Sequence, residues 1–149
     1  MPKSLFPDQQ GKPKEGVKLR RVALITGITG QDGLYLTAYL MSHTDYAYAV
    51  HGIVRKNSAT LGLLEQIVKE GIKRGGEAHL HYGDVTDSQF MDFLIREVRP
   101  DEVYNLAAQS HVQHSFYMPG HTSEVNFQGL MNICQTVVQA GLQERTRIF

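Results

Sequence analysis

The stretch RVALIT at residues 21–26, followed by GITGQDG at 27–33 and LYLTAYLMSH at 34–43, decides the fold of this chain. The first part is a short apolar, β-branched run and the last has apolar residues at helical spacing, so the glycines lie where a strand turns into a helix. Glycines there leave room for a phosphate, and the helix start provides N–H donors and a partial positive charge. The stretch therefore predicts a phosphate-binding turn, with a purely structural glycine turn as the alternative.

The second expected strand, at residues 48–54, ends in a basic turn. An NAD site has an acidic residue about 20 residues beyond the glycines, where it binds the ribose 2′-hydroxyl. This chain instead has Arg55, Lys56, Asn57 and Ser58, and no carboxylate. Because a guanidinium can hold a 2′-phosphate through two parallel hydrogen bonds, the turn favours NADP over NAD. A solvated basic turn is the alternative.

The amino-acid composition limits the classes of protein to which this chain can belong. The 149 residues include 15 Lys plus Arg and 15 Asp plus Glu, so bulk charge gives no reason to expect nucleic acid or an anionic membrane as a partner. No apolar run approaches the length of a membrane span. The single cysteine, Cys134, excludes an internal disulfide framework and fits a reducing, cytoplasmic location. Residues 1–20 are rich in proline and lysine and lack a secretion signal, so we expect a flexible leader before a folded domain at 21–149.

Strand and helix patterns alternate along the rest of the chain. Apolar residues three and four positions apart predict helices at 31–43, 60–73, between Asp87 and Pro100, and at 122–140. Asp87 is the expected cap of the third helix, and Gly141 is placed to end the fourth in a left-handed turn. Further strands are expected at 78–82, at 102–106 and from residue 147.

Repeated strand–helix–strand units predict an α/β fold, a Rossmann-like doubly wound parallel sheet with strand order 3-2-1-4-5. Ligands of such sheets bind beyond the carboxyl ends of the strands, where the order reverses. The glycine turn, Arg55, Asp84 and the segment after Asn105 are all expected there. Because the apolar run at Ile148 and Phe149 stops without a turn or cap, we expect a sheet truncated at its fifth strand, in a fragment of a longer protein.

Four segments resemble the GDP-mannose 4,6-dehydratase family, which belongs to the extended short-chain dehydrogenases/reductases. They are the glycine turn at 27–33, the basic turn at 55–58, YGDVTDS at 82–88 and EVYNLAAQSHV at 102–112. The resemblance covers residues 22–149. Gln31-Asp32 inside the glycine turn and AAQSHV at 107–112 narrow it from extended reductases in general to this family.

The resemblance implies NADP as cofactor and assigns residues to its parts. The pyrophosphate turn would be formed by Gly27, Thr29, Gly30, Gln31 and Asp32, and the 2′-phosphate would meet Arg55 with Lys56, Asn57 and Ser58 beside it. Adenine would lie against Asp84 and Val85, and the nicotinamide-side ribose near Leu106, Ala107, Ala108, Gln109 and Ser110. His121 stands where the family has tyrosine and is a further candidate. Alternatives are a helix cap for Asp84 and simple tight packing for Ala107 and Ala108.

The resemblance also implies an activity and partners. The reaction would convert GDP-D-mannose to GDP-4-dehydro-6-deoxy-D-mannose and water, a step toward GDP-fucose, in a homo-oligomer that is a dimer or a tetramer. The family's catalytic tyrosine lies in Tyr-x-x-x-Lys, but none of the seven tyrosines here has lysine four positions later, so we expect catalytic residues beyond Phe149 and no activity from this chain alone. Another sugar-nucleotide dehydratase or epimerase, or a non-catalytic NADP-binding regulatory module, remain alternatives.

Two weaker patterns complete the candidates. Histidines at 79, 81, 111, 114 and 121 raise the question of a metal site, but scattered histidines near a polar crevice are the favoured interpretation. Asn126 and Gly129 match a loose asparagine–glycine pattern of extended reductases and would steady the site from the fourth helix. The alternative is an ordinary polar helix position.

Overall fold

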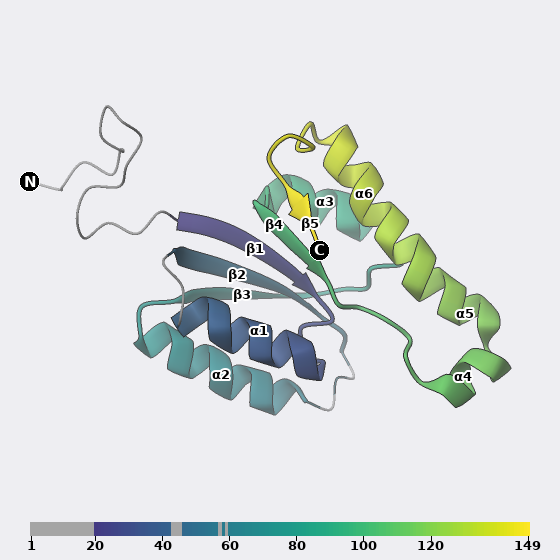
Figure 1. Cartoon of the computed structure of the whole chain (residues 1–149), viewed down its shortest axis with the longest axis horizontal. Helices are drawn as coiled ribbons and strands as arrows, with labels where there is room; N and C mark the ends of the chain where they lie inside the picture. The colour runs from purple at the N-terminus through teal and green to yellow at the C-terminus, as the bar shows by residue number, and fades with distance from the viewer. Residues whose placement is uncertain (1–19, 43–45, 57, 59) are drawn as a thin grey trace, which may run out of the picture.

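The computed structural model describes residues 20–42, 46–56, 58 and 60–149 (Figure 1). Of the expected leader, only Arg20 falls within this range, and it begins the first strand. The prediction for Asn57 lies outside the described residues.

In the described part of the chain, parallel strands form one sheet in the order β3-β2-β1-β4-β5, which confirms the predicted order. They are β1 (Arg20–Thr26), β2 (Ala47–Val54), β3 (Glu77–Tyr82), β4 (Glu102–Asn105) and β5 (Arg147–Ile148). Thr26 pairs with Asn105, and Val54 pairs with Tyr82. The carboxyl ends of β1 to β4 therefore meet along one edge, with the reversal of order between β1 and β4.

Helices cover both faces of the sheet (Figure 1). On one face lie α1 (Gln31–Ser42) and α2 (Leu61–Lys73), and on the other α3 (Ser88–Val98) and α6 (Gly129–Gln139). Strand side chains alternate between the two layers. Val50 and Val54 pack in the cluster that includes α1 and α2, whereas Leu24 and Ile53 pack in the cluster that includes α3 and α6. Each buried aliphatic side chain contributes about 1.5–3 kcal/mol, so the two clusters fix the sheet between its helices.

Two predicted helix ends are confirmed. The Asp87 carboxylate accepts hydrogen bonds from the amides of Gln89 and Phe90 at 3.0 Å, and so caps α3. Gly141 has φ +67° directly after the end of α6 and its cap residue, Ala140. The left-handed turn that the sequence predicted there is therefore present.

The predicted helix at 122–140 is present, but it begins three residues earlier, at Pro119, and its middle is a π-helix. The segment consists of α5 (Pro119–Ser123), a π-helix η1 (Glu124–Gln128) and α6, and a further helix, α4 (Val112–Tyr117), precedes them. Proline at the first position of α5 starts that helix early, because the missing N–H is not needed there. The sequence pattern missed α4 because its apolar side chains point to solvent, with Phe116 80% and Tyr117 85% exposed. The fourth strand also ends one residue before the predicted Leu106.

Within the described residues, no helix combines the length and the apolar character that crossing a membrane would require.

Candidate functional site

A groove of about 590 Å³ lies at the carboxyl ends of the central strands, within the size range of ligand sites. Four loops contribute to it, together with the first turn of α1, Ile53 of β2 and Val125 of η1 (Glu124–Gln128). The lining residues are Gly27, Thr29, Gly30, Gln31, Asp32, Gly33, Ile53, Arg55, Ser58, Thr60, Gly83, Asp84, Val85, Leu106, Ala107, Ala108, Ser110 and Val125. The structure thus brings together most of the residues that the sequence assigned to one ligand.

The glycine turn is closed tightly over the end of β4. Gly27 has φ +65°, and a Cβ there would lie 2.6 Å from the Leu106 carbonyl oxygen, so only glycine fits. The Gly30 amide donates to the Gly27 carbonyl oxygen at 2.9 Å, and the Leu34 amide donates to that of Gly30 at 2.9 Å. The amides in the first turn of α1 have no partner within the helix. The turn therefore offers N–H donors at the edge of the groove, as an anion site requires.

The basic turn after β2 is tied to the glycine turn. The Thr60 hydroxyl donates to the Thr29 carbonyl oxygen at 2.5 Å, and the Thr29 hydroxyl donates to the Ser58 hydroxyl at 3.3 Å. Arg55 lines the groove beside them, and no ion pair within the described residues includes it. Its guanidinium is therefore available to an anion that enters the groove.

The loop after β3 carries Asp84, an acidic residue that lines the groove. The amide and hydroxyl of Thr86 both donate to Asp84 Oδ1, at 3.0 and 2.9 Å. Val85 is buried in the core cluster of α3 and α6. Because Asp87 caps α3, the alternative assignment of Asp84 as that cap is wrong.

The loop after β4 is held from two sides. The Ala107 amide donates to the buried Thr26 hydroxyl at 3.1 Å, and that hydroxyl donates to Asn105 Oδ1 at 2.7 Å. On the other side, the Gln109 amide donates to Asn126 Oδ1 at 2.8 Å, and Asn126 lies in the π-helix η1. This hydrogen bond confirms the expected contact between Asn126 and this region.

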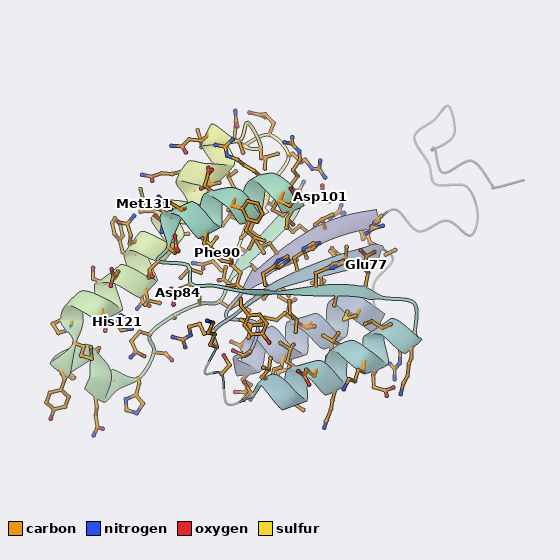
Figure 2. All side chains as sticks on the ribbon, turned by 180° about the vertical axis from the view of Figure 1, so that it is seen from behind. Glu77, Asp84, Phe90, Asp101, His121 and Met131 are labelled. Carbon is orange, nitrogen blue, oxygen red and sulfur yellow. The ribbon has the colours of Figure 1, made fainter. Side chains whose placement is uncertain are left out.

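Three predicted residues do not line the groove: Lys56, Gln109 and His121. Gln109 is tied to Asn126, and His121 lies on α5, where its Nδ1 is 3.9 Å from Glu124 Oε2 (Figure 2). Sequence reasoning in turn did not assign Ile53, Thr60, Gly83 and Val125 to the site. Gly83 directly precedes Asp84, and Ile53 and Thr60 lie two positions from Arg55 and Ser58. Val125 is distant from all of them in the sequence and reaches the groove because it packs in the same core cluster as Ile53.

A second groove, of about 650 Å³, lies on the outer surface between α3 and α6, away from the strand ends. Its lining is mostly polar helix-surface side chains such as Gln89, Asp92 and Gln135, and it carries no glycine turn. The groove at the strand ends is therefore the better candidate site.

The histidines of β2 and β3 form a stack on the sheet. His51 lies with its ring centroid 4.7 Å from that of His79 and 5.2 Å from that of His81, and its Nδ1 is 3.0 Å from His81 Nε2. Burial, with the charges of His79 and His81, lowers the pKa of His51 to about 4. In the part of the chain that the structure describes, no group of three His, Cys, Asp or Glu side chains is arranged to hold a metal ion.

Comparison with known proteins agrees with this geometry. The family model for GDP-mannose 4,6 dehydratase matches residues 24–149. The chain belongs to the GDP-mannose 4,6-dehydratase family. It is 41% identical to the GDP-mannose 4,6 dehydratase of Drosophila melanogaster over 146 residues, with 95% of this chain and 36% of that protein covered. It is 42% identical to that of Homo sapiens over 143 residues, with 95% and 36% covered.

The chain spans about a third of the length of these GDP-mannose 4,6-dehydratases. Among solved structures it is similar to UDP-glucose 4-epimerase from Bifidobacterium longum in complex with NAD+ and UDP, with a TM-score of 0.69 and 20% identity over 81% of this chain and 34% of that one. It is also similar to the UDP-glucose 4-epimerase from Stenotrophomonas maltophila with bound NAD. The TM-score is 0.65 and the sequence identity 22%, over 82% of this chain and 34% of that one. At this identity the likeness shows the Rossmann-like fold alone.

Proposed function

We propose that the groove binds NADP and that the chain supplies the cofactor-binding part of a GDP-mannose 4,6-dehydratase. The observation that carries the proposal is the position of Arg55. It lines the same groove as the glycine turn, at the end of the strand where an NAD site has a carboxylate. A guanidinium there matches a 2′-phosphate in charge and in geometry.

The residues present fit such a cofactor. At Gly27 and Gly33, a Cβ would lie 2.6 Å from other backbone atoms of the protein, so these glycines allow the tight turn that brings the N–H groups at the start of α1 to the groove, where a pyrophosphate would accept from them. Arg55 and Ser58 line the groove together and would meet the 2′-phosphate. Asp84, Val85 and Ile53 border the groove on the side expected for adenine, and Leu106, Ala107, Ala108 and Ser110 border the nicotinamide side.

For the whole protein we propose the family's reaction, dehydration of GDP-mannose. Bound NADP supplies a hydride acceptor that also returns the hydride. The part played by this chain is to bind and orient the cofactor, with its amides and Arg55 on the phosphates and the tethered loop after β4 beside the reactive end. The acid and base groups fall to other residues, because no Tyr-x-x-x-Lys is present in these 149 residues.

Charge reversal of Arg55 tests the cofactor. Arg55→Glu should weaken NADP binding about 10- to 100-fold, the effect of removing hydrogen bonds between charged groups, and should change NAD binding far less. Direct titration of the chain with each dinucleotide measures both affinities. Lys69→Glu is the matched control, because it makes the same charge change on the exposed surface of α2, outside the groove.

Equal losses for NADP and NAD in Arg55→Glu would remove the assignment of NADP. Failure of the unaltered chain to bind either dinucleotide would remove the cofactor site as a whole.

We further infer a homo-oligomer in a reducing, cytoplasmic compartment. Large apolar side chains are exposed along the helices on one side of the sheet, namely Phe93, Phe116, Tyr117, Phe127 and Val138. Exposed apolar side chains such as these are available for contacts between chains. Sedimentation equilibrium of the purified protein tests this, and a monomer at all concentrations would contradict it.

A further inference from the structure

Asn132 on α6 reaches across to the loop after β3. Its Nδ2 donates to the Val85 carbonyl oxygen at 2.9 Å and approaches the Thr86 carbonyl oxygen at 3.3 Å. The residue is only 3% exposed and does not line the groove at the strand ends. A buried side-chain amide is costly unless it is hydrogen-bonded, so its bonds to this loop are strongly favoured over other arrangements.

Two neighbours of Asn132 fix the contact. Gln128, one turn earlier, donates from Nε2 to Asn132 Oδ1 at 2.9 Å, so the NH₂ group of Asn132 is turned toward the loop. At Gly129 a Cβ would lie 2.7 Å from Val85 Cγ2, so α6 approaches the loop more closely than any side chain would permit. The residues at the start of α6 therefore allow Asn132 to hold this loop by hydrogen bonds.

The loop that Asn132 holds is the loop after β3, which also carries Asp84. The carbonyls of Val85 and Thr86 are held by Asn132, and the amide and hydroxyl of Thr86 are held by Asp84 Oδ1. No hydrogen bond within the described residues uses Asp84 Oδ2, and Asp84 and Val85 both border the groove. A rotation of the peptide after Val85 would move the Thr86 amide, and the Asp84 carboxylate would move with it.

We propose that Asn132 is a positioning residue for base recognition. By fixing the Val85 and Thr86 carbonyls it aims the Asp84 carboxylate at the exocyclic amine of a base in the groove. It thereby selects adenine over a base with a carbonyl oxygen at that position, because a carboxylate accepts from an amine and repels a carbonyl. The proposal rests on the proposed NADP site and adds to it a residue that touches no part of the ligand.

The test compares two ligands on the chain as it exists. The probes are NADP and its hypoxanthine analogue, in which a carbonyl replaces the amino group of adenine. The unaltered chain should prefer NADP about tenfold or more, the discrimination expected from one hydrogen bond to a charged group. In Asn132→Asp, which keeps the shape of the side chain but removes both donors, the ratio of the two affinities should fall at least about fivefold.

Matched variants separate positioning from mere stability. Gln128→Glu lies on an exposed position, so folding is retained, and its carboxylate repels Asn132 Oδ1 and favours a flipped amide. It should lower the ratio in the same direction. Ile133→Val removes one buried methylene from the same helix and touches neither loop carbonyl, so the ratio should stay unchanged even if both affinities drop.

The outcomes are distinguishable. Equal weakening of both ligands in Asn132→Asp would overturn the proposal and leave the NADP site standing. If Asn132→Asp does not fold, an unchanged ratio in Gln128→Glu overturns it in the same way. Equal affinity of the unaltered chain for both ligands would show that Asp84 does not read the base. If the unaltered chain binds neither ligand, the NADP site itself fails and the proposal with it.

Discussion

The amino and carboxyl ends of the strands use charged side chains differently. Figure 2 shows Glu77 and Asp101 at the amino ends and Asp84 at the carboxyl end. At the amino ends three arginines are paired with carboxylates, and the pairs are Arg20–Glu77, Arg21–Glu102 and Arg145–Asp101. At the carboxyl ends, Arg55 and Asp84 border the groove, and no ion pair of the described residues includes either.

Glu102 is the main hydrogen-bond acceptor among the ion pairs at the amino ends of the strands. It is 5% exposed and accepts from Arg21 at 2.5 Å, from the Tyr48 hydroxyl at 2.8 Å and from the Tyr104 hydroxyl at 3.0 Å. Its hydrogen bond raises the pKa of Arg21. Burial, assisted by Glu102, raises the pKa of Tyr48 to about 12, and the same causes raise the pKa of Tyr104. All three donors therefore stay protonated at neutral pH.

This comparison distinguishes charged side chains that stabilise the fold from charged side chains that are available to a ligand. A carboxylate whose bonds are met by the protein contributes to folding, and its loss should leave ligand affinity unchanged. A guanidinium and a carboxylate oxygen without protein partners at the edge of a groove are available to a ligand. Local interactions that the protein leaves incomplete are expected at functional sites.

The largest effect on stability should come from removing the Glu102 carboxylate at the amino ends of the strands. Glu102→Ala leaves the Arg21 guanidinium, the buried Tyr48 hydroxyl and the half-buried Tyr104 hydroxyl without their acceptor, which should cost about 3–5 kcal/mol of unfolding free energy. Urea unfolding measures the loss, and Glu102→Gln, which retains an acceptor, should lose less. Dinucleotide affinity of the folded variants should stay unchanged. A parallel loss of affinity would show that the two ends are not separate in function.

A somewhat smaller effect should come from the glycine turn. Gly27→Ala combines a left-handed backbone with a Cβ 2.6 Å from main-chain oxygen, and should cost about 2–4 kcal/mol and abolish dinucleotide binding. Gly75→Ala is the matched control, because Gly75 also has positive φ, at +90°, but a Cβ there meets nothing within 4 Å. It should cost only about 1 kcal/mol, without effect on binding. Similar costs at the two positions would contradict the close approach at the groove.

The smallest effect should be the pH dependence of the histidine stack, which belongs to neither end. Because the pKa of folded His51 lies near 4, below the ordinary 6.5, the unfolded chain binds a proton first as the pH falls. Stability is therefore complete above pH 6.5 and is lost as the pH falls from 6.5 toward 4. Solvent screening of the half-exposed ring limits the loss to about 1 kcal/mol between pH 7 and 5.

His51 faces His79 and His81, with Glu77 and Arg20 also acting on it. His51→Gln removes the group with the depressed pKa and should flatten this dependence, as measured by urea midpoints at each pH. An identical slope in His51→Gln and the unaltered chain would assign the effect to other groups.

Local patterns predicted much of the fold and of the site. The order of the strands follows from alternating strands and helices with right-handed crossovers, and it is the order observed. The caps at Asp87 and Gly141 follow from residue chemistry that acts within a few positions. Arg55, Asp84 and the glycine turn could be placed in one groove because parallel strands end at the same edge.

The rest depended on contacts between residues far apart in the sequence. Nothing local showed that α4 would form with its apolar face exposed, or that the last long helix would contain a π-helix at residues 124–128. The histidine stack needed the register of β2 against β3, which places His51 opposite His79.

The sequence by itself determined that the chain turns from β1 through bare glycines into a helix and follows its second strand with Arg55, because these are properties of neighbouring residues. Only the tertiary structure decided that Asn126 and Asn132 hold the two loops on either side of the groove. Those bonds span 17 and 47 positions of the chain and form only when η1 and α6 pack across the ends of the strands.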